Sequence, residues 1–403
     1  MLRLRDKRPI LVTCAKGIAP YLKVEVQSLG LPVLSWGEAH VETEGALLEA
    51  MGLNLHLRTA QRVLLLLEEF KASDPQGLYR EVARIEWEEL IPEEGYLSVT
   101  SWVDNPTIAD SRFANQRCKD AIVDRVMERC GRRPDSGPER KGVVVHLFWQ
   151  GKRCALYLDT SGEPLSKRGY RKISLQAPLQ ETLAAALILA TGWEGKGDLI
   201  NPMCGSGTLA IEGALIALNR APGLLRDNYG FMHVKGFREG EWRQLRQRAK
   251  GETRGTLGGE IIATDISTQA VKAAAKNAAE AGVDRAIQFA VCDYSETRVP
   301  GRGGVVILNP EYGERLGKHK DLEAIYRGIG DFFKKRCQGY KGYVFTGNLP
   351  LVKKIGLRTK RRMTFFNSNI ECRLLEYDLY QGSKRRSRVK GGDAQISESE
   401  GEE

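Results

Sequence analysis

Hydrophobic and polar positions in the second half of the chain alternate between two periods. Short apolar runs at residues 261–265, 287–291, 304–308 and 342–346 predict strands. Between them, residues 208–218, 267–281 and 321–335 repeat their apolar positions with helical spacing, and residues 361–367 and 372–379 predict a final hairpin. Alternating strands and helices predict an α/β fold with a doubly wound, mostly parallel sheet closed by an antiparallel edge.

The first 160 residues mix strands and helices over shorter spans, which is typical of compact α+β modules. The pattern predicts strands at residues 10–14, 40–43, 63–70, 97–102, 142–149 and 153–159, and helices at 20–29, 46–60, 78–83 and 115–130. Arg58 and Arg62 are expected to be solvated charges at a helix end, with an RNA contact as the alternative. A polar connector at 159–172 leads to a helix at 177–190, with Pro178 in its first turn.

Residues 199–208, LINPMCGSGT, organise the second half of the chain. The apolar approach ending at Ile200 predicts a buried parallel strand, Cys204-Gly205-Ser206-Gly207 predicts a tight turn, and Thr208 begins a helix. Glycines without a Cβ leave backbone N–H groups open to an anionic or polar ligand. A turn of this composition is also found as a plain tight loop, so residues further along the chain must decide between the two.

Three predicted strands end on or next to a polar residue, at Asn201, Asp265 and Asp293. Ligands of doubly wound sheets bind at the carboxyl ends of the strands, so these side chains are expected at the ligand edge. There Asp265 could accept hydrogen bonds from ribose hydroxyls, and Asp293 could accept one from an adenine amino group. Each acid taken alone is more commonly a helix N-cap or a turn residue.

The sequence Asn309-Pro310-Glu311-Tyr312 follows the strand at 304–308. It resembles the (Asp/Asn)-Pro-Pro-(Tyr/Phe) catalytic loop of a methyltransferase family, and the resemblance implies an amine as the methyl acceptor. An amine conjugated to an aromatic base is a poor nucleophile. The side-chain oxygen of Asn309 and the carbonyl of Pro310 can accept both amine hydrogens, which restores lone-pair density on the nitrogen. Tyr312 can stack on a base that has been flipped out of its helix. Such a site works by positioning and polarisation, with no metal and no covalent intermediate.

This ordered set resembles the S-adenosylmethionine-dependent methyltransferases with an (Asp/Asn)-Pro-Pro-(Tyr/Phe) loop. With SGEPLSKRGYR at 161–171, APLQETLA at 177–184, and motifs at 120–124 and 131–134, the chain resembles the THUMP-containing RNA guanine-N2 methyltransferases over nearly its whole length. The similarity is greatest to the RlmL-type enzymes of bacterial large-subunit ribosomal RNA. No second methyltransferase domain is recognisable.

The resemblance implies a ferredoxin-like module at 1–60, a THUMP RNA-binding domain at 61–160 and a Rossmann-like methyltransferase domain at 161–380. It implies S-adenosyl-L-methionine as the cofactor and Asn309, Pro310 and Tyr312 as catalytic residues. The cofactor-binding residues that it implies are Asn201, Cys204, Gly205, Ser206, Gly207, Thr208, Asp265 and Asp293.

Two positions depart from the family pattern. Asn201 stands where the family usually has aspartate, so this position accepts a hydrogen bond but carries no charge. Glu311 replaces the second proline of the loop, which frees φ at that position and brings a carboxylate near the amine. That carboxylate could repel the amine, or it could stabilise the positive charge that develops on it. Activity is expected to be retained, because Asn309 and the Pro310 carbonyl remain.

The charge balance favours a polyanionic partner. Lys and Arg number 61 against 51 Asp and Glu, a net charge of +10, with a basic but inert surface as the alternative. An insertion at 219–259 carries nine basic residues against four acids and is a candidate grip on a phosphate backbone. A second cationic region surrounds the helix at 115–130, through Arg117, Lys119, Arg125, Arg129, Arg132 and Arg133.

Composition also excludes several classes of protein. The eight cysteines are scattered and the five histidines do not cluster near them, so neither a metal site nor a disulfide framework is expected. No signal peptide and no bilayer-spanning run is recognisable, so a cytoplasmic protein without a membrane partner is expected. Residues 381–403 switch from basic to acidic and serine-bearing, which predicts a disordered tail.

The leading hypothesis is an RNA methyltransferase that modifies the exocyclic N2 amine of a guanine, in 23S ribosomal RNA. Two alternatives stay open. One is a THUMP methyltransferase acting on transfer RNA. The other is a catalytically silent RNA-binding protein that keeps the cofactor pocket for stability or assembly, and Glu311 is the residue that favours it.

Overall fold

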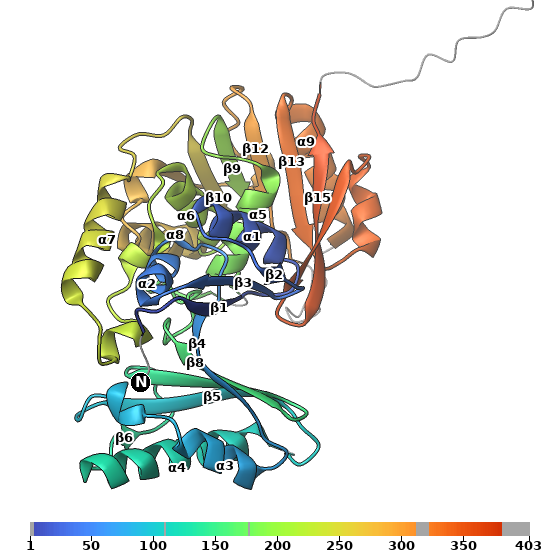
Figure 1. The fold of residues 1–403 in the computed structure, drawn as a ribbon. Coiled ribbons are helices and arrows are strands. Elements are labelled where there is room, and N and C mark those ends of the chain that lie inside the picture. Colours follow the sequence, from blue (N-terminus) through green and yellow to red (C-terminus); the bar gives the residue numbers. More distant parts are fainter. Residues whose placement is uncertain (1–3, 109, 176–177, 312–321, 381–403) are drawn as a thin grey trace, which may run out of the picture.

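The computed structural model describes residues 4–108, 110–175, 178–311 and 322–380, which form two β-sheets with helices packed on them (Figure 1). The tail expected at 381–403 lies outside these residues. We refer below to the N-terminal module (4–60), the middle module (61–160) and the C-terminal domain (161–380).

The first two modules share one sheet of eight strands, in the order β2-β3-β1-β4-β8-β7-β5-β6. The strands are β1 (Arg8–Thr13), β2 (Ser35–Trp36), β3 (His40–Gly45), β4 (Arg62–Lys71), β5 (Tyr96–Asp104), β6 (Asp135–Ser136), β7 (Val143–Gln150) and β8 (Arg153–Asp159). The helices of the N-terminal module are α1 (Ala19–Ser28) and α2 (Leu47–His56), and those of the middle module are α3 (Pro75–Ala83) and α4 (Ser111–Cys130).

Strand β4 joins the two modules. Its first half pairs antiparallel with β1, with Leu65 opposite Ile10, and its residues from Leu64 to Lys71 pair antiparallel with β8. The register shifts between Leu66 and Glu68, so an irregularity interrupts the ladder with β8 just beyond the pairing with β1. Six of its eight strands match the pattern of the sequence, but the two-residue strands β2 and β6 and the sharing of one sheet by two modules were not predicted.

The C-terminal domain has a seven-stranded sheet in the order β11-β10-β9-β12-β13-β15-β14. Strands β9 to β13 are parallel to one another, and β15 and β14 form an antiparallel edge. The predicted doubly wound sheet with an antiparallel edge is therefore confirmed. Its strands are β9 (Asp198–Pro202), β10 (Ile261–Asp265), β11 (Ile287–Val291), β12 (Gly304–Leu308), β13 (Tyr340–Thr346), β14 (Arg361–Asn367) and β15 (Ile370–Asp378).

Helices cover both faces of this sheet. On one face, Leu199 of β9 and Ile307 of β12 belong to the cluster that includes α5 (Glu181–Thr191), α6 (Thr208–Ala217) and α8 (Thr268–Glu280). On the other face, Ile200 and Val306 pack with α9 (Leu322–Arg336). Burial on both sides explains why these strands are continuous apolar runs in the sequence. The insertion at 219–259 adds a further helix, α7 (Glu239–Gly251).

Several helix boundaries differ from the sequence prediction, and two of the differences concern the surroundings of Pro178 and Arg58. Helix α5 begins at Glu181, with Gln180 as its N-cap, so Pro178 precedes the helix and does not lie in its first turn. Helix α2 ends at His56, because Leu57 is extended with φ −67° and ψ 125°. The chain therefore leaves the helix before Arg58.

The expectation that Arg58 and Arg62 are solvated is wrong. Arg58 Nη1 donates to the backbone carbonyl of Arg220 at 3.0 Å, and the carbonyl of Arg58 accepts a hydrogen bond from Arg168. Arg62 forms an ion pair with the fully buried Asp159 and donates to the carbonyl of Gly162 at 2.9 Å. Both arginines therefore attach the N-terminal part of the chain to the segment that enters the C-terminal domain.

Candidate active site at the carboxyl edge of the seven-stranded sheet

The predicted glycine turn connects β9 to α6. Gly205 (φ +54°) and Gly207 (φ +83°) both adopt the left-handed region, and Gly207 is the N-cap of α6. The N–H of Gly207 donates to the carbonyl of Cys204 at 2.9 Å, which closes the turn. The N–H of Cys204 donates to the carbonyl of Thr264 in β10 at 2.9 Å, which ties the turn to the neighbouring strand.

The two glycines meet different surroundings. A Cβ at Gly207 would lie 2.8 Å from the Cβ of Ala274, so this glycine allows α6 to approach α8 closely. A Cβ at Gly205 would meet nothing within 4 Å. Gly207 therefore serves helix packing, whereas Gly205 borders open space in which a ligand could approach the backbone.

Cys204, Ser206 and Thr208 complete the turn. Cys204 is buried, and burial raises the pKa of its thiol well above the usual range, so the side chain is uncharged near neutral pH. The hydroxyl of Ser206 accepts a hydrogen bond from Arg171 at 3.2 Å. Thr208 is buried at the first position of α6.

Asp265 lies next to the turn, as the sequence predicts. One carboxylate oxygen accepts the N–H of Gly205 at 3.0 Å, and the other accepts the N–H of Ser267 at 3.0 Å. The following residue, Ile266, has 70% of its surface exposed. A carboxylate and a large exposed aliphatic side chain thus adjoin each other at the end of β10, which could serve a ligand with a polar and a flat apolar part.

Asp293 is an N-cap, the role that the sequence analysis gave as the alternative for an isolated acid. It caps the 3-10 turn Tyr294–Glu296, and its Oδ1 accepts hydrogen bonds from the N–H of Ser295 at 2.9 Å and from the Ser295 hydroxyl at 2.6 Å. Capping uses one carboxylate oxygen. A ligand role for the other oxygen stays a prediction.

Asn201 and Asn309 lie at the carboxyl ends of the adjacent parallel strands β9 and β12. Asn201 is fully buried, and its Nδ2 donates to the carbonyl of Ile307 at 3.0 Å. The Oδ1 atoms of Asn201 and Asn309 are both buried, and neither has a hydrogen-bond partner among the residues that the structure describes. A buried acceptor without a donor is costly, so two of them at one edge indicate a place for a ligand that donates hydrogen bonds.

The rest of the predicted catalytic loop is described only in part. Pro310 is buried and Glu311 is exposed. Tyr312 lies outside the described residues.

Two residues that the sequence analysis did not single out support the glycine turn. Arg171 donates to the hydroxyl of Ser206 in the turn. It also donates through Nε to Glu181 Oε1 at 2.8 Å and to the carbonyl of Leu179 at 2.7 Å. Asn277 of α8 donates to the carbonyl of Ser206 at 3.2 Å. The signal for Asn277 was present, because a single amide follows Ala270 and Ala274 on the apolar face of a helix.

The basic insertion is largely engaged with the protein itself. Five of its nine cations donate to backbone carbonyls: Arg220, Arg226, Lys235, Arg246 and Arg254. Lys235 reaches the carbonyl of Glu88, so the insertion connects the C-terminal domain with the middle module.

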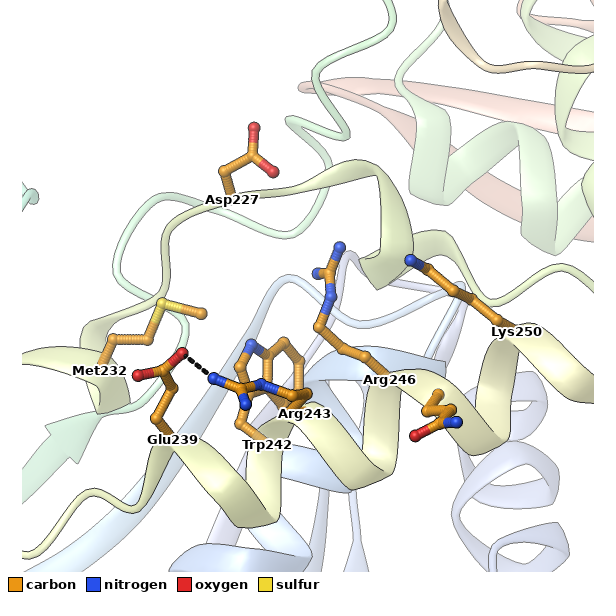
Figure 2. Close-up of a pocket in the computed structure, with 8 residues that line it drawn as sticks. Asp227, Met232, Glu239, Trp242, Arg243, Arg246 and Lys250 are labelled. Atoms are coloured by element: carbon orange, nitrogen blue, oxygen red, sulfur yellow. Dashed lines mark hydrogen bonds and ion pairs between the residues drawn. The ribbon is translucent and has the colours of Figure 1, made fainter.

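A depression of about 420 Å³ lies beside α7 (Figure 2). Arg243, Arg246 and Lys250 project from the helix into its surroundings, and Arg243 pairs with Glu239 at 2.8 Å. Arg246 donates to the carbonyl of Arg226 at 3.0 Å. The residues that line the depression therefore carry charges of both signs. Among its cations, only the Lys250 side chain has no hydrogen bond or ion pair with the described residues.

In the cationic region around α4, three of the arginines have protein partners, and one of these pairs is Arg132 with Glu94 at 3.7 Å. Arg125 forms an ion pair with Glu88 at 2.6 Å, and Arg117 lies 4.4 Å from the ring centre of Tyr79. The described residues contain no group of three or more His, Cys, Asp or Glu side chains that could hold a metal ion. Within the same residues, no helix is long and apolar enough to cross a bilayer.

Three family patterns match the chain. Residues 168–376 match the RMKL-like methyltransferase domain, residues 9–64 match the RlmL ferredoxin-like domain, and residues 72–159 match the THUMP domain. Together they cover most of the two sheets.

Curated relatives agree with these matches. The ribosomal RNA large subunit methyltransferase K/L of Syntrophotalea carbinolica is 38% identical over 392 residues, which cover 95% of this chain and 54% of the relative. The protein of the same name from Methylococcus capsulatus is 36% identical over 378 residues, 92% of this chain and 51% of the relative. The chain thus spans about half the length of these relatives. A protein of Synechocystis sp. that is named as an RNA methyltransferase is 35% identical over 373 residues, 93% of this chain and 97% of the relative.

Solved structures share the whole architecture. SMU.472, a methyltransferase crystallised with SAH, superposes with a TM-score of 0.83 at 26% identity, over 94% of this chain and 99% of that chain. A protein from Listeria monocytogenes named as an N6-adenine-specific DNA methylase superposes with a TM-score of 0.82 at 30% identity, over 92% of this chain and 96% of that chain. The chain belongs to the family of RMKL-like methyltransferases, with an RlmL ferredoxin-like domain and a THUMP domain before the methyltransferase domain.

Proposed function

We propose that this protein is an S-adenosylmethionine-dependent RNA methyltransferase that modifies the N2 amine of a guanine in large-subunit ribosomal RNA. The relatives named for large-subunit ribosomal RNA, the THUMP domain and the net charge of +10 support an RNA substrate. The choice of guanine N2 rests on the resemblance of motifs along the whole chain to the THUMP-containing guanine-N2 methyltransferases, because the Asn-Pro loop alone does not distinguish guanine N2 from adenine N6 or a glutamine amide. A bacterial ribosomal RNA substrate would place the protein in the cytoplasm.

The observation that carries the proposal is the buried Oδ1 of Asn309, which has no hydrogen-bond partner among the described residues. An exocyclic amine is a hydrogen-bond donor and would satisfy this acceptor. Asn309 directly follows β12, at the edge where ligands of doubly wound sheets bind. The backbone carbonyl of Pro310 is the second acceptor that we assign to the amine, so that both hydrogens are held and the lone pair is directed toward the methyl donor.

The residues of this edge fit S-adenosylmethionine. The open space beside Gly205 allows close approach to the backbone, Asp265 offers carboxylate oxygens for ribose hydroxyls, and the exposed Ile266 offers an apolar surface for a flat base. When bound, this cofactor supplies an electrophilic methyl group. Asn201, with its unpartnered Oδ1, would accept a hydrogen bond from the polar part of the donor.

The modules divide the work in this proposal. The N-terminal module and the THUMP domain bind RNA, and residues 161–380 carry the chemistry. Arg62, through Asp159 and Gly162, and Lys235, through Glu88, fix the RNA-binding part against the catalytic part.

The test measures methyl transfer from labelled S-adenosylmethionine to RNA of a strain that lacks the gene, followed by mass spectrometry of the nucleosides. We expect N2-methylguanosine in large-subunit ribosomal RNA with the wild-type protein. We expect none with Asn309→Ala, which should still bind SAH with nearly wild-type affinity. Full turnover by Asn309→Ala would contradict the catalytic assignment. Methylation of transfer RNA, or of adenine N6 as in the name of the Listeria protein, would replace the substrate assignment.

A second candidate function is a catalytically silent RNA-binding protein, and the exposed Glu311 in place of proline favours it. The same assay separates the two functions. If the protein binds SAH but transfers no methyl group to naked RNA or to RNA in ribosomal particles, the result would support the catalytically silent function.

A further inference from the structure

The N-terminal module packs directly against the edge hairpin of the C-terminal domain. Gly17, just before α1, lies against β14 so closely that a Cβ would meet the carbonyl oxygen of Thr364 at 2.6 Å. Tyr21 of α1 stacks on Phe365 with ring centres 5.7 Å apart and an interplanar angle of 16°. The loop before α1 is therefore fixed to the tip half of the β14–β15 hairpin (Figure 1).

Strand register places this contact at the same edge as Asn309. Strand β14 runs in the direction of β13, because both are antiparallel to β15, and Thr364 and Thr346 share one row through Arg373. Phe366 lies two residues beyond that row. Phe366 is separated from Asn309 by three strand spacings across the sheet, which is about 14 Å. Along the strand direction the two residues are about 10 Å apart. The diagonal of roughly 17 Å equals about five stacked nucleotides at 3.4 Å each.

Two aromatic rings with neighbouring lysines lie at this place. Lys16 is 6.0 Å from the ring centre of Phe366, and Lys23 is 5.1 Å from the ring centre of Trp36. Trp36 stands on the two-residue edge strand β2 and has 50% of its surface exposed. Lys16 also pairs at 3.1 Å with Glu38, which follows Trp36 by two residues, so the ion pair brings the segment after β2 next to Lys16. We call Lys16, Lys23, Trp36 and Phe366 the aromatic–lysine surface.

We propose that the aromatic–lysine surface binds a single-stranded RNA segment that flanks the target nucleotide, by stacking of bases on Trp36 and Phe366. This proposal rests on the proposed function. Aromatic rings bind bases of any sequence through their π-faces, and nearby cations neutralise the phosphates. The pair of Lys16 with Glu38 is exposed and therefore weak, so a phosphate can replace the carboxylate. A base that is modified on its exocyclic amine must leave its helix, which leaves its neighbours unstacked and available.

The test compares RNA affinities of full-length variants by fluorescence anisotropy, with a labelled single-stranded decamer and a duplex of the same length. Trp36→Leu removes the π-face, Trp36→Phe keeps one, and Phe366→Leu tests the second ring. Trp36→Phe is the matched control, because it keeps an aromatic ring at the same half-exposed position. SAH affinity and the thermal unfolding midpoint of each variant report on its folding.

We expect Trp36→Leu to weaken decamer binding by about tenfold, and Trp36→Phe by less than about threefold. Duplex binding and SAH affinity should be unchanged in both. Unchanged decamer binding by Trp36→Leu would overturn the proposal and leave the surface to a protein partner. Equal losses in Trp36→Leu and Trp36→Phe would overturn it too, because the loss would then not depend on a π-face. If decamer binding depends on Trp36 but the protein transfers no methyl group to RNA, the proposed function would be refuted and the RNA-binding role of the surface would be supported.

Discussion

Asn277 of α8 donates its side-chain Nδ2 to the backbone carbonyl of Ser206 at 3.2 Å, in the middle of the glycine turn. The same side chain accepts the N–H groups of Lys172 and Ile173 at 2.9 and 3.0 Å and donates to the carbonyl of Ile173 at 3.0 Å. One buried amide thereby holds together a helix, the glycine turn and the connector that arrives from the middle module.

Replacement of Asn277 by alanine should destabilise the fold and weaken donor binding together. The change leaves buried backbone groups unpaired, so we expect a loss of about 2 kcal/mol in the free energy of unfolding. SAH affinity should fall because the turn loses its support. Urea denaturation and calorimetry would measure both. Lys276→Ala, which removes only an exposed ion pair on the same helix, is the control and should stay within about 0.5 kcal/mol of wild type.

Alanine at the two glycines of the turn should have separable effects. Gly207→Ala combines a left-handed φ with a contact of 2.8 Å to Ala274, so it should lower the thermal midpoint strongly. Gly205→Ala suffers only the backbone strain, about 1 kcal/mol, and should act mainly on SAH affinity. Equal unfolding midpoints in the two variants would contradict the packing role of Gly207.

Asp265→Ala should weaken SAH binding by about tenfold or more, because the variant loses a charged acceptor and releases the N–H of Gly205. Calorimetric titration with SAH measures the effect. Asp331→Ala, an exposed acid on α9, is the matched control and should bind as wild type does. Equal affinities in the two variants would refute the assignment of Asp265 to the donor site.

Glu311→Gln should leave turnover within about threefold of wild type, since Asn309 and the Pro310 carbonyl supply the acceptors that we assign to the amine. The measurement is the initial rate of methyl transfer at saturating donor. A loss as large as that of Asn309→Ala would place the carboxylate of Glu311 in the reaction itself.

Acid should weaken the fold through His146 of β7. Burial, with Arg62 and Arg140 nearby, lowers the pKa of this imidazole to about 4 from its usual 6.5. Between those pH values the unfolded chain binds a proton that the folded chain does not, so stability falls as pH falls through this window. Between pH 7.5 and 4.5, wild type should lose about 2 kcal/mol more than His146→Gln, at 1.36 kcal/mol per pH unit. Urea denaturation at both pH values tests this, and an equal loss in both proteins would contradict it.

The sequence was sufficient where burial alone sets the pattern. The runs at 261–265 and 304–308 coincide with β10 and β12, because strands covered on both faces leave continuous apolar segments. The run at 287–291 coincides with β11, although in this edge strand only Ile287 is buried. The predicted neighbours Gly205 and Asp265 are hydrogen-bonded, since adjacent parallel strands bring their carboxyl ends to one edge.

The sequence was insufficient where a polar side chain finds its partner far along the chain. Arg58 was expected in water, but its acceptor is a carbonyl 162 residues away at Arg220. The support that Asn277 gives to Ser206, 71 residues away, has the same cause. Local periodicity reports which face is apolar, and it contains no information about which distant backbone group a buried arginine or amide will meet.

Strand β4 has a consequence for how far the catalytic edge can lie from bound RNA. Because its backbone is hydrogen-bonded to β1 on one side and to β8 on the other, the ferredoxin-like and THUMP domains cannot swing apart without breaking a ladder. If these domains bind RNA as proposed, their fixed arrangement would select a nucleotide by its distance from the bound part of the RNA.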